Sequence, residues 1–328
     1  MRIHLKPRIN VLLVTGLVLA AGTASAQGYP AKPIRLIVPY GPGGGTDVAA
    51  RITAHYLGER LGVQVVVENR IGGSGAVGLV AAARAVPDGY TLLFSGPDAI
   101  STLPLLRKNL PIDTLKDFVP IAQVGTADFV FAVHPKVPAQ TIEELIALAK
   151  SKPGALRYSS AGPGTTLHVM GEMLKYRTGI DLVHVPYKSG GQAAIDTVGG
   201  HVEMISTAVS VIIKQIQAEQ LRPLAVSSAE RSSLLPTVPT MAERGFPNFI
   251  ATSWFGVFGP KGLPEPVLKQ LSEDIKAAAS SVEFRQRTEA IGIGGKVVLR
   301  EEFAKYIATE LGRWREVIEA AKIKVDEQ

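Results

Sequence analysis

The chain has 328 residues, of which 46% are hydrophobic and 20% charged, a balance typical of a folded globular protein with room for two domains. The formal net charge is +6, but the basic residues are scattered and form no stripe or arm, so we expect no nucleic-acid partner. The absence of cysteine excludes disulfides, thiol nucleophiles, cysteine–zinc sites and iron–sulfur clusters.

The first 26 residues have the pattern of an export signal. Arg2, Lys6 and Arg8 precede an apolar run over residues 9–21, which is too short to span a membrane. Small residues then lead to Ala26, where we expect cleavage. The mature protein would carry a net charge of +3, because the removed segment holds three basic and no acidic residues. We therefore expect an exported protein.

The mature sequence begins with alternating strand and helix patterns. Residues 34–38 form a short apolar run that predicts a buried strand, and the apolar spacing over 46–61 predicts a helix. Predicted strands at 63–68 and 90–94 flank a second helix at 76–86. This alternation is typical of an α/β fold with a largely parallel sheet.

The turn between the first strand and helix, Pro-Tyr-Gly-Pro-Gly-Gly-Gly-Thr-Asp at 39–47, is a candidate anion site. The first N–H groups of a helix have no intrahelical partner, the helix dipole is positive there, and glycines let a ligand approach the backbone. The same glycines could instead serve only the geometry of the turn, and this stretch alone leaves both interpretations open.

The motif recurs about 120 residues later as Ser-Ser-Ala-Gly-Pro-Gly-Thr-Thr at 159–166. The Gly-Pro-Gly of 41–43 returns at 162–164, and a threonine lies near the predicted helix start both times. Two such helix starts that face each other would bind an anion with two negative ends.

A dinucleotide fingerprint, Gly73-x-Gly75-x-x-Gly78, also has to be weighed. It follows a strand and opens a helix, and Asp98 lies about 20 residues further on. The acidic residue of that motif should end the next strand, however, whereas Asp98 lies four residues beyond Phe94. We therefore interpret these glycines as serving a tight turn and close packing.

The remaining chain repeats the alternation and then ends in helices. We predict strands at 118–124, 127–133, 181–185, 199–205, 221–226 and 254–258, and helices at 141–150, 166–176, 192–198, 210–219, 267–278 and 301–322. The stretch from residue 95 to the strand at 118 is loop-like, and 282–300 is predicted as a connection. The last two helices are expected to pack back onto the first domain.

No set of residues predicts catalysis or a metal site. The histidines lack the His-Glu-x-x-His spacing, the Walker signature is absent, and Ser74 and Ser160 lack the frame of a hydrolase nucleophile. His168 is expected to be structural and Lys188 solvated. We expect no cofactor and no metal, and keep an exported enzyme acting on an anionic small molecule as the alternative to a binding protein.

Taken together, the short motifs resemble the extracytoplasmic solute receptors of the tripartite tricarboxylate transporter family, also called the Bug family. The resemblance covers nearly the whole mature chain. It is carried by Tyr29-Pro30-x-x-Pro33-Ile34-Arg35, Val38-Pro39-Tyr40-x-Pro42-Gly43-Gly44-x-Thr46-Asp47, Val67-Glu68-Asn69-Arg70-x-Gly72-Gly73, the turn 160–168, Val185-Pro186-Tyr187-Lys188-x-Gly190-Gly191, Leu224-Ala225-Val226, Leu235-Pro236-x-Val238-Pro239-Thr240 and Trp254-Phe255-Gly256.

The resemblance implies a periplasmic binding protein fold, with two α/β lobes, a ligand cleft between them and two crossover connections. Lobe 1 would comprise residues 27–124 and 249–328, and lobe 2 residues 125–248. It also implies a monomeric receptor that captures a small carboxylate, such as a di- or tricarboxylate or an aromatic acid, and delivers it to an integral-membrane permease. Closure would occur by rotation at crossings near 125–128 and 247–253.

Carried over residue by residue, the resemblance also implies ligand contacts. Those in lobe 1 would come from Tyr40, Gly43, Gly44, Gly45 and Thr46, with Ser95 nearby. Those in lobe 2 would come from Ser160, Ala161, Gly164, Thr165 and Thr166, with Ser189, Gly190, Ser206 and Trp254 as wall residues. Many members carry an acidic residue near position 207 that is missing here, which favours a ligand without an amine unless Asp98 substitutes for it.

Overall fold

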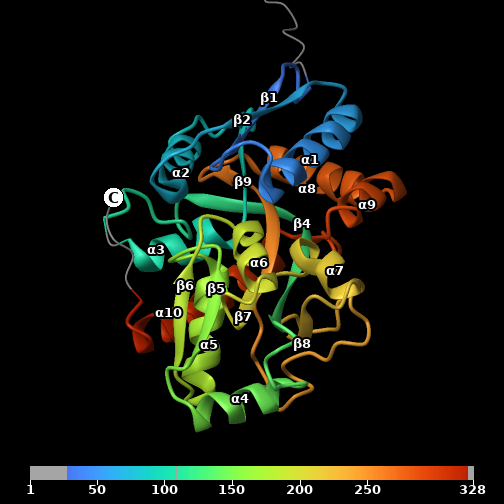
Figure 1. Ribbon diagram of the computed structural model, residues 1–328. Helices are drawn as coiled ribbons and strands as arrows, with labels where there is room; N and C mark the ends of the chain where they lie inside the picture. Colours follow the sequence, from blue (N-terminus) through green and yellow to red (C-terminus); the bar gives the residue numbers. More distant parts are fainter. Residues whose placement is uncertain (1–27, 108, 324–328) are drawn as a thin grey trace, which may run out of the picture.

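Two sheets share one long strand, β4, in the computed structural model, which describes residues 28–107 and 109–323 (Figure 1). The predicted export signal lies outside these residues. The first sheet contains β1 (Ile34–Val38), β2 (Val65–Asn69), β3 (Thr91–Ser95), β9 (Thr252–Pro260) and β10 (Val298–Leu299). The second contains β5 (Leu156–Ser160), β6 (Leu182–Pro186), β7 (Met204–Ala208) and β8 (Arg222–Val226).

The first sheet is covered on both faces because its strands are apolar on both faces. On β1, Leu36 packs into a cluster with helices α1 (Gly45–Leu61), α8 (Glu265–Ala279) and α9 (Val282–Glu289). Ile37, the next residue, packs with helix α2 (Ala76–Ala83) on the opposite face. The predicted parallel pairing of β1, β2 and β3 is confirmed.

The second sheet is also covered on both faces, by four helices of its own. These are α4 (Ile142–Ser151), α5 (Thr166–Thr178), α6 (Gly190–Val198) and α7 (Val209–Gln217). On β4, Phe131 packs in the cluster with α4 and α5, whereas Val130 packs in the cluster with α6 and α7. The alternation of side chains along β4 therefore separates two layers of helices.

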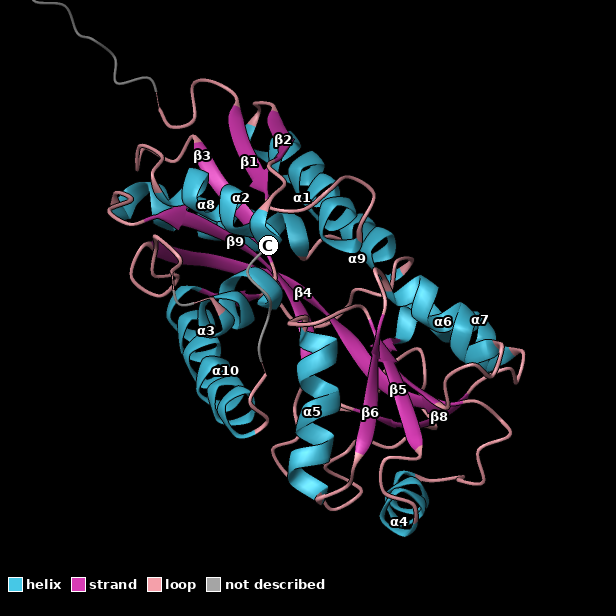
Figure 2. Cartoon of the chain, turned by 60° about the vertical axis from the view of Figure 1, so that its left-hand side comes forward, coloured by secondary structure: helices cyan, strands magenta, loops and turns pink. Residues whose placement is uncertain are grey.

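Strand β4 (Phe118–Val133) is one continuous strand, although the sequence predicts two strands at 118–124 and 127–133. It pairs antiparallel with β9 from Phe118 opposite Pro260 to Asp128 opposite Thr252, through two register irregularities. The two crossings between the halves therefore lie side by side and are hydrogen-bonded to each other (Figure 2). This pairing supplies the order that the local sequence around Gly125 lacks.

Helix α10 (Arg300–Ala320) contacts both halves of the molecule. Phe303 and Ile307 pack in the cluster with α2, as expected for a helix that returns to the first domain. Trp314 and Val317 instead join the cluster of α4 and α5 in the second half. The helix therefore forms a third link between the halves, which the sequence did not predict. The expected lobe boundaries remain a prediction.

Three helical segments lie where the sequence predicts none. They are the π-helical turn η3 (Asp98–Thr102), α3 (Leu103–Leu106) and α9. The sequence does not predict helix α9, because its eight residues contain two large apolar residues, Val282 and Phe284, which are too few to define a helical face. Only Phe284 is buried. The η3 turn matters for the site, because it directly follows β3 and carries Asp98.

Glu310 of α10 is fully buried and accepts hydrogen bonds from two neighbouring donors. The indole Nε1 of Trp254 donates to both of its carboxylate oxygens at 2.9 and 3.1 Å, and the Ser101 hydroxyl donates at 2.6 Å. Burial raises the pKa of Glu310 to about 7 despite these hydrogen bonds. The group therefore joins β9, η3 and α10 in one buried cluster.

The raised pKa predicts a pH dependence of stability. The folded state holds the Glu310 proton up to about pH 7, whereas an ordinary glutamate loses it near 4.5. At low pH this group therefore contributes to the stability of the folded state. That contribution, about 3 kcal/mol, is lost as pH rises from about 4.5 through 7. In urea denaturation at pH 4.5 and 8, Glu310→Gln should remove this contribution to the pH dependence, whereas Glu319→Gln, on the exposed face of α10, should retain it. If wild type lost no more unfolding free energy between pH 4.5 and 8 than Glu310→Gln does, the raised pKa of Glu310 would be contradicted.

Candidate functional site

The start of helix α1 presents open backbone N–H groups. Gly44 is its N-cap and Gly45 its first residue, and neither supplies a capping side chain. In the described part of the chain, the N–H groups of Gly44, Gly45 and Thr46 have no hydrogen-bond acceptor. A Cβ atom built on Gly43 or Gly45 would meet nothing within 4 Å, so this backbone is accessible. Gly43 also needs to be glycine, because its φ is +84°.

Asp47 holds this loop in place. Its buried carboxylate accepts hydrogen bonds from the Gly43 N–H at 2.9 Å, from Arg51 at 3.0 Å and from the Asn69 amide at 2.8 Å. The same Asn69 amide donates to the Tyr40 carbonyl at 2.9 Å. Although burial opposes it, these hydrogen bonds lower the pKa of Asp47, which therefore remains ionised. Asp47 and Asn69 are positioning residues that the sequence-based list of contacts omitted.

Within the part of the chain that the structure describes, three buried hydroxyl groups near the glycine turns have no hydrogen-bond partner. They belong to Tyr40 and Ser95, both expected site residues, and to Thr207. Burial and the nearby Asp98 hold the pKa of Tyr40 well above its ordinary value, so its hydroxyl remains a neutral donor. Buried hydroxyl groups are normally hydrogen-bonded, so unpartnered ones beside the glycine turns favour a site that receives a ligand or water.

The start of helix α5, the second predicted anion site, uses most of its donors internally. Thr165 is the N-cap, and its hydroxyl accepts from the His168 N–H at 3.3 Å and donates to the Gly162 carbonyl at 2.8 Å. The Gly164 N–H donates to Nδ1 of His168, and the Gly162 N–H donates to the Ser160 hydroxyl. These groups therefore shape the turn, and few of its N–H groups remain open to a ligand.

Asp98 occupies the position that the sequence predicts for a ligand anion at α5. Its Oδ1 accepts from the Thr166 N–H at 2.9 Å and from the Thr166 hydroxyl at 2.5 Å. Asp98 follows β3 in the first half, whereas Thr166 begins a helix of the second half. The contact therefore joins the halves and neutralises the N-terminal end of α5 with a carboxylate of the protein itself.

Two stacked histidines support the second turn. The rings of His168 and His184 lie 4.1 Å apart, and Nε2 of His184 is 2.7 Å from the Ser160 hydroxyl. Burial, followed by the proximity of His168, lowers the pKa of His184 to about 3, and burial also lowers that of His168. Both rings are therefore neutral near pH 7. His168 is structural, as expected from the sequence.

The remaining expected site residues differ in whether their side chains or backbone are available to a ligand. Ser189 caps helix α6, whose first residue Gly190 lies so close to Thr207 that an added Cβ would be 3.0 Å from its hydroxyl. Ser206 is buried and donates to the Leu167 carbonyl at 2.8 Å, so it anchors α5. Trp254 is wrong as a wall residue: its side chain is fully buried and hydrogen-bonded to Glu310. Ala161 is half-buried in the turn before α5.

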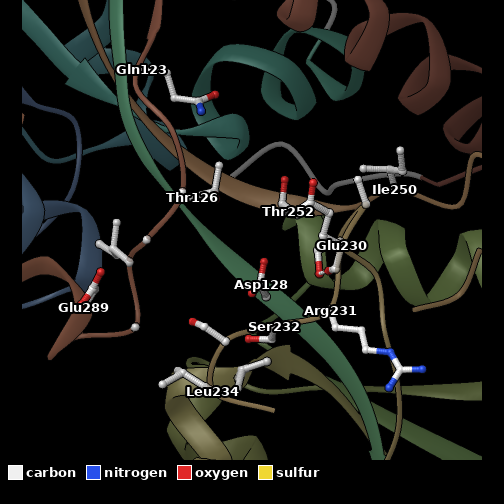
Figure 3. A pocket seen from close by; sticks show the side chains of 18 of the residues that line it. Gln123, Thr126, Asp128, Glu230, Arg231, Ser232, Leu234, Ile250, Thr252 and Glu289 are labelled. Carbon is white, nitrogen blue, oxygen red and sulfur yellow. Dashed lines mark hydrogen bonds between the residues drawn. The ribbon is translucent and has the colours of Figure 1, made fainter. Parts of the chain in front are cut away.

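A cavity of about 700 Å³ lies elsewhere, along the crossing strands (Figure 3). None of the expected site residues lines it. Its charged residues are Asp128, Glu230, Glu289, Glu302 and Arg231, so acids outnumber bases. Burial raises the pKa of Asp128, which shows a poor environment for negative charge. The cavity therefore suits a carboxylate less well than the start of α1 does.

Comparison with known proteins decides the family. Residues 49–323 match the model described as "Tripartite tricarboxylate transporter family receptor". The chain belongs to this family. It is similar to Protein BugT of Bordetella pertussis, with 37% identity over 322 residues, 96% of this chain and 99% of the relative. The resemblance inferred from the short motifs is thereby confirmed.

Solved structures agree with this assignment. R. palustris Rpa4515 with adipate has a TM-score of 0.77 and 29% identity, over 90% of this chain and 99% of that one. MatC from Rhodopseudomonas palustris with bound malate has a TM-score of 0.72 and 26% identity, over 88% of this chain and 100% of that one. The two-lobe periplasmic binding protein fold is confirmed. The family comprises solute-binding receptors, so the protein is a receptor and not an enzyme.

Within 28–107 and 109–323, no helix combines the length and apolarity needed to span a membrane. In the same stretches, no three His, Asp or Glu side chains gather where they could hold a metal ion.

The capping role of Thr165 predicts a loss of stability on mutation. Thr165→Val should cost about 1 kcal/mol of unfolding free energy, because the His168 N–H loses its acceptor. Thr165→Ser keeps the hydroxyl and should stay within about 0.5 kcal/mol of wild type. Urea denaturation of the three proteins without ligand measures this. Equal stability of Thr165→Val and Thr165→Ser would rule out the cap as the main role of this hydroxyl.

Proposed function

We propose that the protein is exported to the periplasm, captures a small carboxylate against the start of helix α1, and delivers it to an integral-membrane permease. The observation that carries the proposal is the row of open N–H groups at Gly44, Gly45 and Thr46. The loop is already fixed by Asp47, so a ligand finds the donors in place. The related structures with adipate and malate support a carboxylate as ligand.

The energetics of such a site are sufficient without arginine. A carboxylate at a helix N-terminus gains about 0.3–2 kcal/mol from the dipole. Each hydrogen bond to a charged group adds about 1.5–3 kcal/mol. Three N–H groups and the Thr46 hydroxyl, less the cost of association, can therefore give micromolar binding, about −8 kcal/mol. Tyr40 and Ser95 supply two further hydroxyl donors from the same lobe.

The proposed site includes the second half of the molecule as well. The starts of α5 and α6 would meet the ligand from lobe 2, with the orphan hydroxyl of Thr207 and the backbone at Gly190 and Ala161 as contacts. Ser160, Gly164 and Thr165 act through the shape of the turn, since their polar groups are used within it. We propose that the receptor is monomeric.

The Thr46 hydroxyl offers a test of the site. It has no hydrogen-bond partner in the described part of the chain, so Thr46→Val should leave stability within about 0.5 kcal/mol of wild type. Loss of one hydrogen bond to a carboxylate should weaken binding about tenfold or more. The ligand is first identified by native mass spectrometry of protein purified from the periplasm, and affinities are then measured by calorimetry. Thr309→Val, on the exposed face of α10, is the matched control. Unchanged affinity in Thr46→Val would contradict the site.

Ligand binding should also close the lobes. Rotation is expected about β4 and β9 near their pairing of Thr126 with Trp254, although α10, which packs on both halves, limits its extent. Small-angle scattering should show a smaller radius of gyration with saturating ligand than without it. An unchanged radius with a tightly bound ligand would show that closure is not part of the mechanism.

A further inference from the structure

We propose that Asp98 determines which carboxylates this receptor accepts: a ligand with one carboxylate and, at its other end, a hydrogen-bond donor such as a hydroxyl or ammonium group. The inference rests on the proposed carboxylate function and deepens it. It predicts that linear dicarboxylates are poor ligands, in contrast to the adipate and malate of the related structures.

The two predicted anion sites differ in what fills them. At α1 the N–H groups of Gly44, Gly45 and Thr46 are open, so this end can receive a ligand carboxylate. At α5 the N–H and hydroxyl of Thr166 already bind Oδ1 of Asp98. A second ligand carboxylate at α5 would meet an occupied donor pair and a like charge.

The charge of Asp98 has no basic partner. Among the ion pairs of the described residues, none involves Asp98, and the only donors there to its carboxylate belong to Thr166. Its Oδ2 has no hydrogen-bond partner within those residues. This oxygen can therefore accept from a ligand hydroxyl or ammonium group, and it repels a carboxylate at close range.

Buried orphan hydroxyls next to Asp98 point independently to a ligand at this place. Tyr40 and Ala99, the residue after Asp98, both lie within 4 Å of a Cβ atom built on Gly75, and they pack in the same apolar cluster. Ser95 ends β3, three residues before Asp98. Both hydroxyls are buried, and neither lies within hydrogen-bond distance of a partner in the described residues. Tyr40 also belongs to the loop that leads into α1, so the open N–H groups and Asp98 border the same region. One ligand could thus contact both.

The turn that carries Asp98 is anchored by hydrogen bonds at its other residues. The Ser101 hydroxyl donates to the buried Glu310, and the Thr114 hydroxyl donates to the Ile100 carbonyl at 2.8 Å. The carboxylate is therefore held in position rather than free to swing aside for a competing anion.

Calorimetry with matched acids tests the inference. Succinate is compared with 4-hydroxybutyrate and 4-aminobutyrate, and adipate with 6-hydroxyhexanoate and 6-aminohexanoate. At each chain length, wild type should bind the tighter of the hydroxy acid and the amino acid at least tenfold more tightly than the diacid. Asp98→Asn keeps a carbonyl oxygen for Thr166 and turns the other oxygen into a donor, so the preference should shift at least tenfold toward the diacid. Glu283→Gln removes an equal charge from an exposed position and should leave the wild-type preference unchanged.

The outcomes separate the two proposals. If wild type binds a diacid as tightly as its matched hydroxy and amino acids, the role of Asp98 is wrong while the carboxylate function stands, and this comparison does not depend on the variant folding. An identical ranking in wild type and a folded Asp98→Asn also overturns it. If none of the acids in this panel, nor any acid identified in the purified protein, binds wild type, the proposed function fails and the inference fails with it.

Discussion

The antiparallel pairing of β4 and β9 is the constraint on which the rest of the molecule depends. Each sheet is hydrogen-bonded to β4, and β3 reaches it through β9, so every loop of the candidate site is attached to this pair. In the proposed closure, the halves would rotate about this pairing and would not slide apart. Because α10 packs its first turns on one half and its last turns on the other, it would limit that rotation.

The sequence predicts the elements that owe their order to local apolar pattern. The strand at Ile34–Val38 appears with the expected bounds, because four apolar residues lie between Pro33 and Pro39, which mark the ends of the run. Sequence-based prediction fails where pairing between distant segments decides the structure. Around Gly125 the apolar pattern breaks, which predicts two strands, but pairing with β9 carries β4 through the break. The helix at 301–322 is predicted, but tertiary packing decides that its last turns contact the second half of the molecule, through Trp314 and Val317.

The site shows the same division between local and long-range information. The sequence identifies both glycine-rich helix starts, and at α1 the group that fixes the turn, Asp47, is only four residues from Gly43. At α5 the decisive partner is Asp98, which lies 68 residues from Thr166 in the chain. Trp254 fails as a wall residue for the same reason, since Glu310, 56 residues away, holds its indole in the core.

The contrast between the two helix starts has an energetic consequence. A carboxylate bound at α1 exchanges water for unoccupied N–H groups and gains the full attraction of the helix dipole. A carboxylate arriving at α5 would have to displace Asp98, so it would gain only the difference between two similar interactions and leave Asp98 without its donors. The two ends of the site are therefore chemically unequal even though their sequence motifs are alike. An internal carboxylate thus converts a repeated anion motif into an asymmetric receptor.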